Sequence, residues 1–304
     1  MTNLYSKLEQ IKKVFDVEKI AHINPDKSYI QKYYLANRLA YTLFQSSKGY
    51  IHMGISRDGV FKLEDLIEPV KFVNEYVKKL PGKANVLELA CGRAANSLYL
   101  AEQNPQGSFS AIDLSDGQLK YAYQNQKKVN NLKIFKGDYH DLSRFEESKF
   151  DICFIVEALC YSTNKEKVLA EVSRILKKDG IFIVIDGYLN KNEAQLDSDV
   201  LLANRLVEIG MAVPKFELYS EFIISAKKYY SVEYEEDISK EVLPSMQRLE
   251  RWARIFFKYT FLSKLLLKIL PKMIVYNSLS GYLMPNLIQE NIANYMITVL
   301  RKRD

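Results

Sequence analysis

The feature that most constrains the fold is an apolar segment, residues 86–89, which runs into a turn of small residues and then into a helix-like segment, residues 96–102. A second apolar segment, residues 110–112, follows and ends at Asp113. In open parallel sheets, ligands bind at the carboxyl ends of the strands, where such turns and carboxylates gather. The pattern therefore predicts a nucleotide-type site in which Asp113 accepts hydrogen bonds from two ribose hydroxyls.

The turn itself argues against a dinucleotide. A pyrophosphate needs a loop of the form GxGxxG, whose backbone N–H groups face the phosphates. Here Gly92 is the only glycine, and Ala90 and Ala94 take two of the small positions. Glu88 would repel a phosphate and suits instead a cationic amino group, such as the methionine moiety of S-adenosylmethionine carries. We therefore expect Glu88 to hold that amino group and Gly92 to allow close approach to the backbone.

Strand-like and helix-like segments continue to alternate after this turn. Residues 150–156 and 181–186 are apolar runs of strand length. Between them, residues 163–176 begin with the capping-box pattern TNKE and carry one apolar stripe, which predicts a helix that Asp179 and Gly180 stop. This alternation predicts an α/β chain with a parallel sheet.

The segment ELACG at residues 88–92 resembles motif I of the class I S-adenosylmethionine-dependent methyltransferases. Further on, DLSDGQ at residues 113–118 is similar to their ribose-binding strand end, and GDY at 137–139 to their adenine-contacting turn. The resemblance extends from about residue 29 to 190 and resumes at the C-terminus. It implies a Rossmann-like sheet of seven strands that ends in an antiparallel hairpin, with S-adenosyl-L-methionine as cofactor and S-adenosyl-L-homocysteine as its product.

The resemblance assigns cofactor contacts to residues of this sequence. Asp113 would hold the ribose, and Asp138 with the N–H of Tyr139 would hold the adenine. Ala90 and Ala94 depart from the glycines usual in motif I; if both need a positive φ, each costs about 1 kcal/mol. The implied cofactor-binding set is Tyr50, Glu88, Ala90, Gly92, Asp113, Leu114, Gln118, Asp138 and Tyr139.

Residues 49–54 (GYIHMG) are similar to the His-x-Gly segment that closes over the cofactor in the tocopherol, sterol and geranyl-diphosphate methyltransferase group. In that group a Glu follows the fourth strand, as Glu157 does here. The resemblance implies active-site roles for Glu157 and Tyr161, and we add His52 and His140 as further candidate catalytic residues. Sterol and phosphoethanolamine enzymes often have His where Tyr161 stands, which argues against those two substrates.

Three functions remain open at this point. The first is C-methylation of an isoprenoid or other alkene, in which a carboxylate and aromatic faces hold a developing carbocation and a base removes a proton. The second is O- or N-methylation of a natural product or quinone-like ring. The third is a non-catalytic lipid- or partner-binding protein that keeps the fold. In each, the acceptor or ligand is a lipophilic small molecule or a partner protein.

Four segments are expected along the chain. Residues 1–80 form N-terminal helices that close over the site, and residues 81–237 form the cofactor-binding core. Residues 238–290 form a mostly helical insertion, at the position where insertions in the resembled family build a substrate cap. Residues 291–304 return as the last strand.

The cap carries many basic residues. Lys264, Lys268 and Lys272 share one helical face if Pro271 only kinks the helix, and apolar residues occupy the others. Such a basic amphipathic helix either lies in the surface of an anionic membrane or covers the core and turns its lysines to water. Both interpretations of residues 248–273 stay open.

Composition narrows the remaining classes. A net charge of +6 without an Arg-rich tail or an aromatic nucleic-acid motif argues against nucleic-acid binding. Three cysteines make no disulfide framework and fit a reducing compartment. No apolar signal region or run of membrane-spanning length occurs, which predicts a cytoplasmic protein with the membrane-peripheral alternative. No His, Cys and Asp cluster has ligand spacing, so no metal is expected. The oligomeric state is not set by the sequence.

Overall fold

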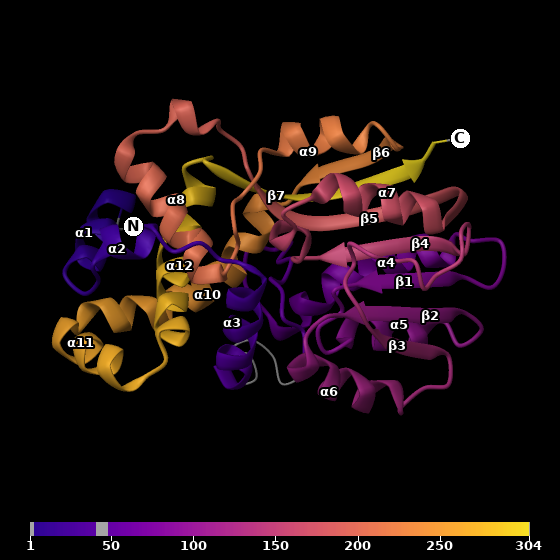
Figure 1. Ribbon diagram of the computed structural model, residues 1–304, viewed down its shortest axis with the longest axis horizontal. Coiled ribbons are helices and arrows are strands. Elements are labelled where there is room, and N and C mark those ends of the chain that lie inside the picture. The colour runs from indigo at the N-terminus through magenta and orange to yellow at the C-terminus, as the bar shows by residue number, and fades with distance from the viewer. Residues whose placement is uncertain (1–2, 41–47, 304) are drawn as a thin grey trace.

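The computed structural model describes residues 3–40 and 48–303. In this part of the chain, seven strands form one sheet in the order β3-β2-β1-β4-β5-β7-β6, drawn from bottom to top in Figure 1. The strands pair in parallel from β3 to β5, whereas β7 runs antiparallel between β5 and β6. Their bounds are β1 (Asn85–Leu89), β2 (Ser108–Asp113), β3 (Leu132–Lys136), β4 (Phe150–Val156), β5 (Leu176–Leu189), β6 (Tyr230–Asp237) and β7 (Ala293–Lys302). The predicted seven-stranded α/β fold is confirmed.

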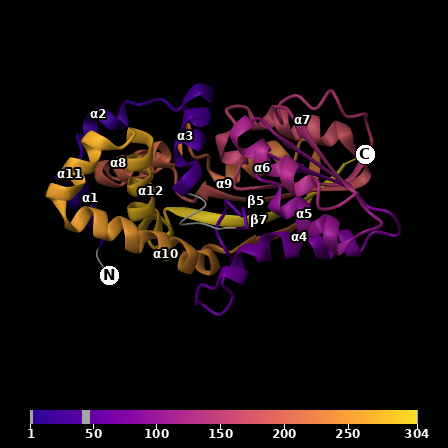
Figure 2. The same ribbon diagram turned by 90° about the horizontal axis from the view of Figure 1, so that it is seen from below.

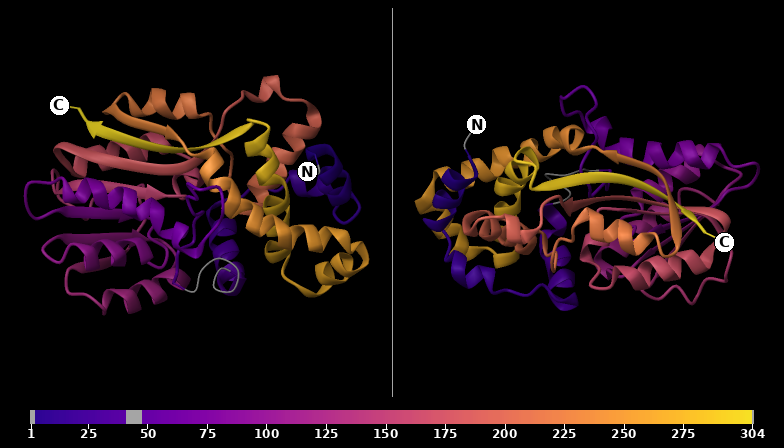
Figure 3. Two further views of the ribbon diagram at one scale, coloured as in Figure 1. Left: turned by 180° about the vertical axis from the view of Figure 1, so that it is seen from behind. Right: turned by 90° about the horizontal axis from the view of Figure 1, so that it is seen from above.

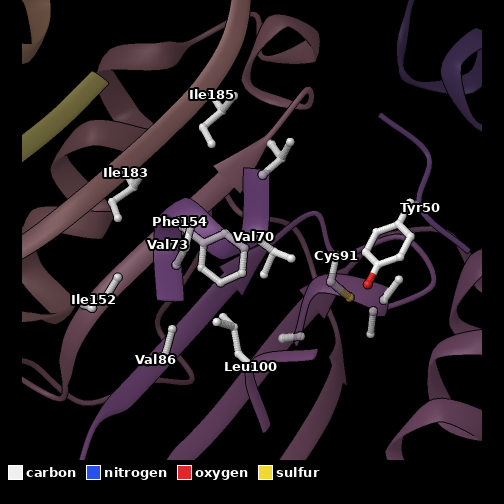
Figure 4. Close-up of a cluster of buried hydrophobic side chains, with 14 of the residues drawn as sticks. Tyr50, Val70, Val73, Val86, Cys91, Leu100, Ile152, Phe154, Ile183 and Ile185 are labelled. Carbon is white, nitrogen blue, oxygen red and sulfur yellow. The ribbon is translucent and has the colours of Figure 1, made fainter. Parts of the chain in front are cut away.

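Both faces of the sheet are covered, because successive strand residues point to opposite sides and both sets are apolar. Val86 and Ile152 belong to the cluster on one face, and Leu87 and Cys153 to the cluster on the other. The first face packs on α4 (Glu68–Lys78), α5 (Ala95–Gln103) and α6 (Asp116–Gln126), and the second on α7 (Lys165–Ile175) and α9 (Tyr219–Ala226). Figure 2 shows α4 and α7 on opposite sides of the sheet, and Figure 4 shows the first cluster.

A second lobe of helices stands beyond the end of the sheet. Its core joins residues of α1, α2, α8, α10 and α12, and α3 packs against α12. Figure 3 shows the N-terminus beside this lobe and the C-terminus at the far end of β7. The bounds are α1 (Leu4–Lys12), α2 (Val17–Ala21), α3 (Lys27–Ala40), α8 (Ser198–Met211), α10 (Ser239–Lys258), α11 (Thr260–Ile269) and α12 (Lys272–Gln289), with single turns η2 (Leu63–Ile67), η3 (Leu159–Tyr161) and η4 (Glu193–Gln195).

The predicted start and stop of the helix at residues 163–176 were wrong. The helix α7 begins one residue later than the capping box suggested, because the Asn164 side chain accepts the Lys167 N–H at 3.0 Å and serves as N-cap. It also ends at Ile175, where the backbone turns extended into β5, so Asp179 and Gly180 do not stop it.

The condition set on Pro271 is not met, because Pro271 separates two helices rather than kinking one. Leu270 before it is extended (φ −91°, ψ 150°), as a residue before proline prefers. Lys272 therefore begins α12, and Lys264 and Lys268 alone share the predicted face of α11. No helix within residues 3–40 and 48–303 combines the length and the hydropathy needed to cross a bilayer.

Candidate active site

A cavity of about 440 Å³ opens where the carboxyl ends of β1, β2 and β4 meet. The turn after β1, the ends of β2 and β3 and residues 49–52 ahead of the sheet line it. Every residue of the predicted cofactor-binding set lies on its wall. The sequence thus located the residues of this cavity, and the contacts described next define what each side chain can do.

The turn after β1 has a left-handed backbone at three alternate positions. Ala90, Gly92 and Ala94 have φ values of 51°, 53° and 57°. This meets the condition under which each alanine costs about 1 kcal/mol relative to glycine. The Ala94 N–H donates to the Cys91 carbonyl at 2.7 Å, which closes the turn and starts α5. The strained turn brings the backbone at Gly92 to the cavity wall.

Glu88 is buried at the end of β1, with 3 % of its surface exposed. One oxygen accepts a hydrogen bond from Asn96 Nδ2 at 3.0 Å, and the other accepts the Ser97 N–H at 3.1 Å and the Ser97 hydroxyl. Burial raises the pKa of Glu88 to about 7 despite these hydrogen bonds. A carboxylate has about four acceptor positions, so three are used within α5. The Glu88 carboxylate can therefore accept one more hydrogen bond, from a donor in the cavity such as an ammonium group.

Asp113 ends β2 and faces the same cavity. Its two oxygens accept the N–H groups of Gly92 at 2.8 Å and Ser115 at 2.7 Å. Burial raises the pKa of Asp113 to about 6. Each oxygen retains a second acceptor position, which suits the two hydroxyls of a ribose.

Gln118, on the wall of this cavity, contributes a buried donor. Its Oε1 accepts a hydrogen bond from Arg93 Nε at 3.1 Å, whereas its Nε2 has no hydrogen-bond partner among the described residues. The residue is 2 % exposed. Since buried polar groups are almost always hydrogen-bonded, this amide favours a bound ligand that carries an acceptor.

The turn after β3 is held by a histidine bridge. His140 Nδ1 lies 2.6 Å from Asp138 Oδ1, and its Nε2 lies 2.7 Å from the hydroxyl of Ser162. The Tyr139 hydroxyl donates to the Ala158 carbonyl at 3.1 Å. His140 thus contacts its own turn through Nδ1 and the loop after β4 through Nε2, so it connects the two segments.

The segment before the sheet lies across the cavity. Tyr50 and His52 are buried and meet edge to face with ring centroids 5.7 Å apart. His52 Nδ1 lies 3.0 Å from the Met53 carbonyl, and its Nε2 lies 3.2 Å from Oδ1 of Asn96, the residue that also contacts Glu88. Burial lowers the pKa of His52, and the hydrogen bonds to Met53 and Asn96 oppose that fall. Figure 4 shows Tyr50 beside Cys91 at the edge of the sheet's core.

Glu157 follows β4 with a left-handed backbone, φ 49°. Its Oε1 accepts the Met53 N–H at 2.5 Å and the hydroxyl of Tyr295 on β7. Burial raises the pKa of Glu157 to about 7, and the hydrogen bond from Tyr295 opposes that rise. Contact with Tyr295 therefore helps the carboxylate to stay ionised near neutral pH.

A second cavity of about 360 Å³ lies on the other side of Glu157, between the sheet and the helical lobe. Most of its wall is apolar and comes from α10, α11 and α12, including Met246, Phe256 and Ile274. Glu157 and Tyr161 line both cavities, as does Tyr34, whose ring packs edge to face on Tyr161 at 5.7 Å. The two cavities therefore meet at Glu157.

Of the four predicted catalytic residues, two stand at this junction. Glu157 and Tyr161 face both cavities, whereas His52 and His140 line only the first. The structure thus places His52 and His140 on the wall of the first cavity and not on that of the second.

Two residues of the site were missed in the sequence. Arg93 lies 4 % exposed on the wall of the first cavity and could have been noticed as a lone cation inside the turn of small residues. Tyr295 had no local signal, because it reaches Glu157 only through the pairing of β7 with β5.

The first cavity fits S-adenosylmethionine on chemical grounds. It offers the carboxylate of Glu88 for an ammonium group and that of Asp113 for a diol. It also offers the cation of Arg93 for a carboxylate and the unpartnered Nε2 of Gln118 for an acceptor. Within the described parts of the chain, no group of three or more His, Cys, Asp or Glu side chains is placed to hold a metal ion.

Comparison with known sequences agrees with this geometry. A family model described as the methyltransferase domain matches residues 81–246. A curated relative, the 24-methylenesterol C-methyltransferase 3 of Arabidopsis thaliana, is 23 % identical over 170 residues, which are 55 % of this chain and 46 % of that protein. The chain thus spans less than half of that relative's length.

Solved structures share the fold at low sequence identity. The [4+2]-cyclase SpnF matches with a TM-score of 0.71 and 18 % identity, over 92 % of this chain and 97 % of that chain. A second match is geranyl diphosphate C-methyltransferase from Streptomyces coelicolor, crystallised with Mg²⁺, geranyl diphosphate and S-adenosyl-L-homocysteine. Its TM-score is 0.64 at 12 % identity, and the match covers 90 % of this chain and 98 % of that chain. The chain therefore belongs to the methyltransferase-domain family, and its sheet has the fold of the class I S-adenosylmethionine-dependent methyltransferases.

Proposed function

We propose that this protein transfers the methyl group of S-adenosylmethionine to an uncharged lipophilic small molecule held in the second cavity. The observation that carries the proposal is the position of Glu157, whose carboxylate stands where the two cavities meet. A cofactor in the first cavity and an acceptor in the second would come together at this residue. The volume of the second cavity lies within the range of about 300–1,000 Å³ that small-molecule sites occupy.

The lining of the second cavity favours an uncharged acceptor. Its polar groups, apart from Glu157, are hydroxyls and amides, such as Tyr33, Asn37 and Asn277. Among its lining residues in the described chain there is no Lys, Arg or His. A diphosphate would need such cations or a metal to balance its charge. We therefore favour a neutral isoprenoid or other alkene over a phosphorylated one.

Carbon methylation matches the chemistry of the junction. S-adenosylmethionine supplies an electrophilic methyl group on a sulfonium. When an alkene carbon of the acceptor bonds to that methyl, the neighbouring carbon becomes cationic. The aromatic rings of Tyr34 and Tyr161 and the carboxylate of Glu157 would stabilise this charge. Glu157 would then accept a proton from the adjacent carbon, which restores a double bond.

Methylation of oxygen or nitrogen is the second candidate, because Glu157 could equally accept a proton from a hydroxyl or amine nucleophile. A phenol or quinol would fit the apolar wall as well as an alkene would. The non-catalytic alternative predicts binding of a lipophilic ligand without turnover.

An acceptor screen with a trideuteromethyl-labelled cofactor tests the proposal. Neutral sterols, isoprenoid alcohols and quinols would be compared with matched phosphorylated compounds, for example geraniol with geranyl diphosphate. We expect a mass increase in a neutral compound only, and NMR of the product would place the new methyl on carbon or on a heteroatom. Methylation of the diphosphate alone would refute the proposed substrate class. Binding of cofactor and lipid without any product would favour the non-catalytic alternative.

A further inference from the structure

Helices α10 and α11 present a large apolar surface to solvent. Phe261 is 86 % exposed, Ile269 67 % and Trp252 57 %. Folded chains seldom expose so many large apolar side chains together unless the surface binds something. We call this surface the α10–α11 tip; it comprises Trp252, Ile255, Tyr259, Phe261, Leu262, Leu265, Ile269 and Leu270.

The apolar residues of α11 form a stripe and not a scatter. Leu262, Leu265 and Ile269 follow spacings of three and four, so they lie along one side of the helix. The exposed Lys264 and Lys268 lie along the adjacent side. The buried Ser263 faces inward and donates to the Tyr259 carbonyl at 3.1 Å. An apolar stripe beside a row of lysines is the pattern of a helix that lies in a membrane surface.

The charged residues of the segment that forms the tip and the helix after it have one sign. Residues 251–289 contain no Asp or Glu, whereas Arg251, Arg254, Lys258, Lys264, Lys268 and Lys272 are basic. Arg254 is paired with Glu250 at 2.7 Å. The other five basic residues, Arg251 and the four lysines, are exposed. A surface of this charge attracts anionic lipid headgroups.

The tip also continues into the second cavity. Trp252 and Leu270 belong both to the exposed tip and to the wall of that cavity, and Leu266 lines the cavity from the same helix. Figure 1 shows α11 at the outer edge of the helical lobe, away from the sheet. An apolar path therefore leads from the outer surface to the junction at Glu157.

We propose that the α10–α11 tip binds to the surface of an anionic lipid bilayer and that a lipophilic acceptor enters the second cavity from that bilayer. The entry route rests on the proposed function, whereas the membrane contact does not. Phe261, Leu262 and Leu265 insert among the lipid chains, and the lysines beside them stay at the headgroups. A protein partner would also cover an apolar surface, but the uniform positive charge favours lipid.

Vesicle binding tests the membrane contact without cofactor or acceptor. Trp252 is the only tryptophan of the chain, so its fluorescence reports on the place where the tip meets the second cavity. We expect a blue shift and co-sedimentation with vesicles that contain phosphatidylserine, and at least tenfold weaker binding to pure phosphatidylcholine. Lys264→Glu with Lys268→Glu should weaken anionic binding at least tenfold, and Phe261→Ser with Leu265→Ser should abolish the blue shift.

Matched controls separate the outcomes. Lys120→Glu with Lys127→Glu makes the same change of charge on α6 and should bind vesicles like the unmodified chain. Unchanged thermal unfolding confirms that each variant is folded. Equal binding to neutral and anionic vesicles, or no binding, overturns the proposal. So does a dimer in sedimentation that Phe261→Ser converts to a monomer, because the tip would then be an interface between copies.

The entry route has its own readout. With an identified acceptor, the tip variants should lose methylation of acceptor embedded in vesicles and keep methylation of acceptor in detergent. Loss of both rates to the same extent would refute entry from the bilayer. Vesicle binding without any methylation would leave the membrane contact intact and count against the proposed function alone.

Discussion

The carboxylate of Glu157, at the end of β4, accepts a hydrogen bond from the hydroxyl of Tyr295 on β7, although 138 positions separate the two residues in the chain. The backbone N–H of Met53 donates to the same oxygen at 2.5 Å. Three parts of the fold thus fix one carboxylate at the junction of the two cavities. The consequence is a carboxyl whose pKa, about 7, lets it accept a proton near neutral pH.

The first prediction concerns this pair. Activity should rise with pH through about 7, because ionised Glu157 is the form that can accept a proton or stabilise a cation. Tyr295→Phe removes a hydrogen bond that lowers the pKa of Glu157, so the rising limb should move to higher pH. Glu157→Gln should lower kcat by about 10²- to 10⁴-fold above pH 7 and should remove the rise of activity with pH, because an amide does not ionise. The measurement is the pH profile of kcat/KM for each variant.

Glu75→Gln, on the exposed side of α4, is the matched control and should reproduce the unmodified profile. A Tyr295→Phe profile with the same pH midpoint as the unmodified enzyme would contradict the assigned role of Tyr295. A Glu157→Gln enzyme within threefold of normal would point to methyl transfer that needs no base.

The second prediction concerns the cofactor cavity. Asp113→Asn replaces an acceptor oxygen by a donor amide that faces backbone N–H groups, so affinity for S-adenosylhomocysteine should fall at least tenfold. Gln118→Leu removes the unpartnered Nε2 donor and should lower the affinity for S-adenosylhomocysteine about two- to tenfold. Calorimetric titration measures both. Asp141 is exposed and lies outside the cavity wall, so Asp141→Asn should bind S-adenosylhomocysteine normally. Equal losses of affinity in the Asp113 and Asp141 variants would refute the assignment of Asp113 to the cofactor.

The strands and the cofactor turn could be predicted because their signals are local. The apolar run of β4 and its acidic terminus stand together in the sequence, and the predicted bounds of β4 equal the observed ones. The same holds for Asp113, since each parallel strand delivers its last residue to the same edge of the sheet.

The acceptor side could not be predicted in this way. Its wall comes from α3, α10, α11 and α12, whose mutual packing depends on side-chain fit across long separations. Tyr295 reaches Glu157 through the register of β7 with β5, which no local pattern encodes. The break at Pro271 was left open for the same reason, because a proline can kink or end a helix depending on the contacts that the next segment makes.

The third prediction tests the strained turn after β1. Ala90→Gly should raise the free energy of unfolding by about 1 kcal/mol, because glycine adopts φ 51° without steric cost. Ala94→Gly should raise the free energy of unfolding by less, because the substitution also removes the fully buried methyl group of Ala94, which contributes about 0.8 kcal/mol. Urea denaturation measures both. Ala101→Gly, inside α5 and also buried, is the control and should destabilise by about 1–2 kcal/mol, because it loses both helix propensity and a buried methyl group. Equal losses at positions 90 and 101 would show that the turn is not strained.

The fourth prediction is a pH dependence of stability. Burial raises the pKa of Glu88 from 4.5 to about 7, so the folded chain keeps a proton that the unfolded chain releases. The stabilisation is complete below pH 4.5 and is lost as pH rises to about 7, a change on the order of 3 kcal/mol. Glu157 and Asp113 contribute in the same direction.

Glu88→Gln should therefore flatten the fall in unfolding free energy between about pH 4.5 and 7, whatever its effect on absolute stability. Denaturation midpoints across this pH range measure the slope. Exposed Glu75→Gln serves as control and should keep the slope of the unmodified chain. A Glu88→Gln slope as steep as that of the unmodified chain would mean that Glu88 is ionised throughout.

The fifth prediction concerns the attachment of α1 to the helical lobe. Lys7 is 2 % exposed, and its Nζ lies 2.9 Å from Glu250 and donates to the Tyr282 carbonyl at 2.7 Å. Lys7→Met should destabilise the chain by about 2–4 kcal/mol, because it leaves a buried carboxylate and a buried carbonyl with one partner fewer. The loss stays below the full cost of an unpaired charge, since Arg254 still contacts Glu250 at 2.7 Å. Chemical denaturation measures it.

Two further variants identify the cause of that loss. Lys7→Met combined with Glu250→Gln removes both charges and should recover part of the stability, because a neutral amide is less costly to bury than an unpaired charge. Lys12→Met breaks only surface ion pairs, with Glu9 and Asp199, and should change the free energy of unfolding by less than about 1 kcal/mol. If the double variant were as unstable as the sum of the single ones, the buried pair would not be coupled, and the effect of Lys7 would come from its bonds to α12 instead.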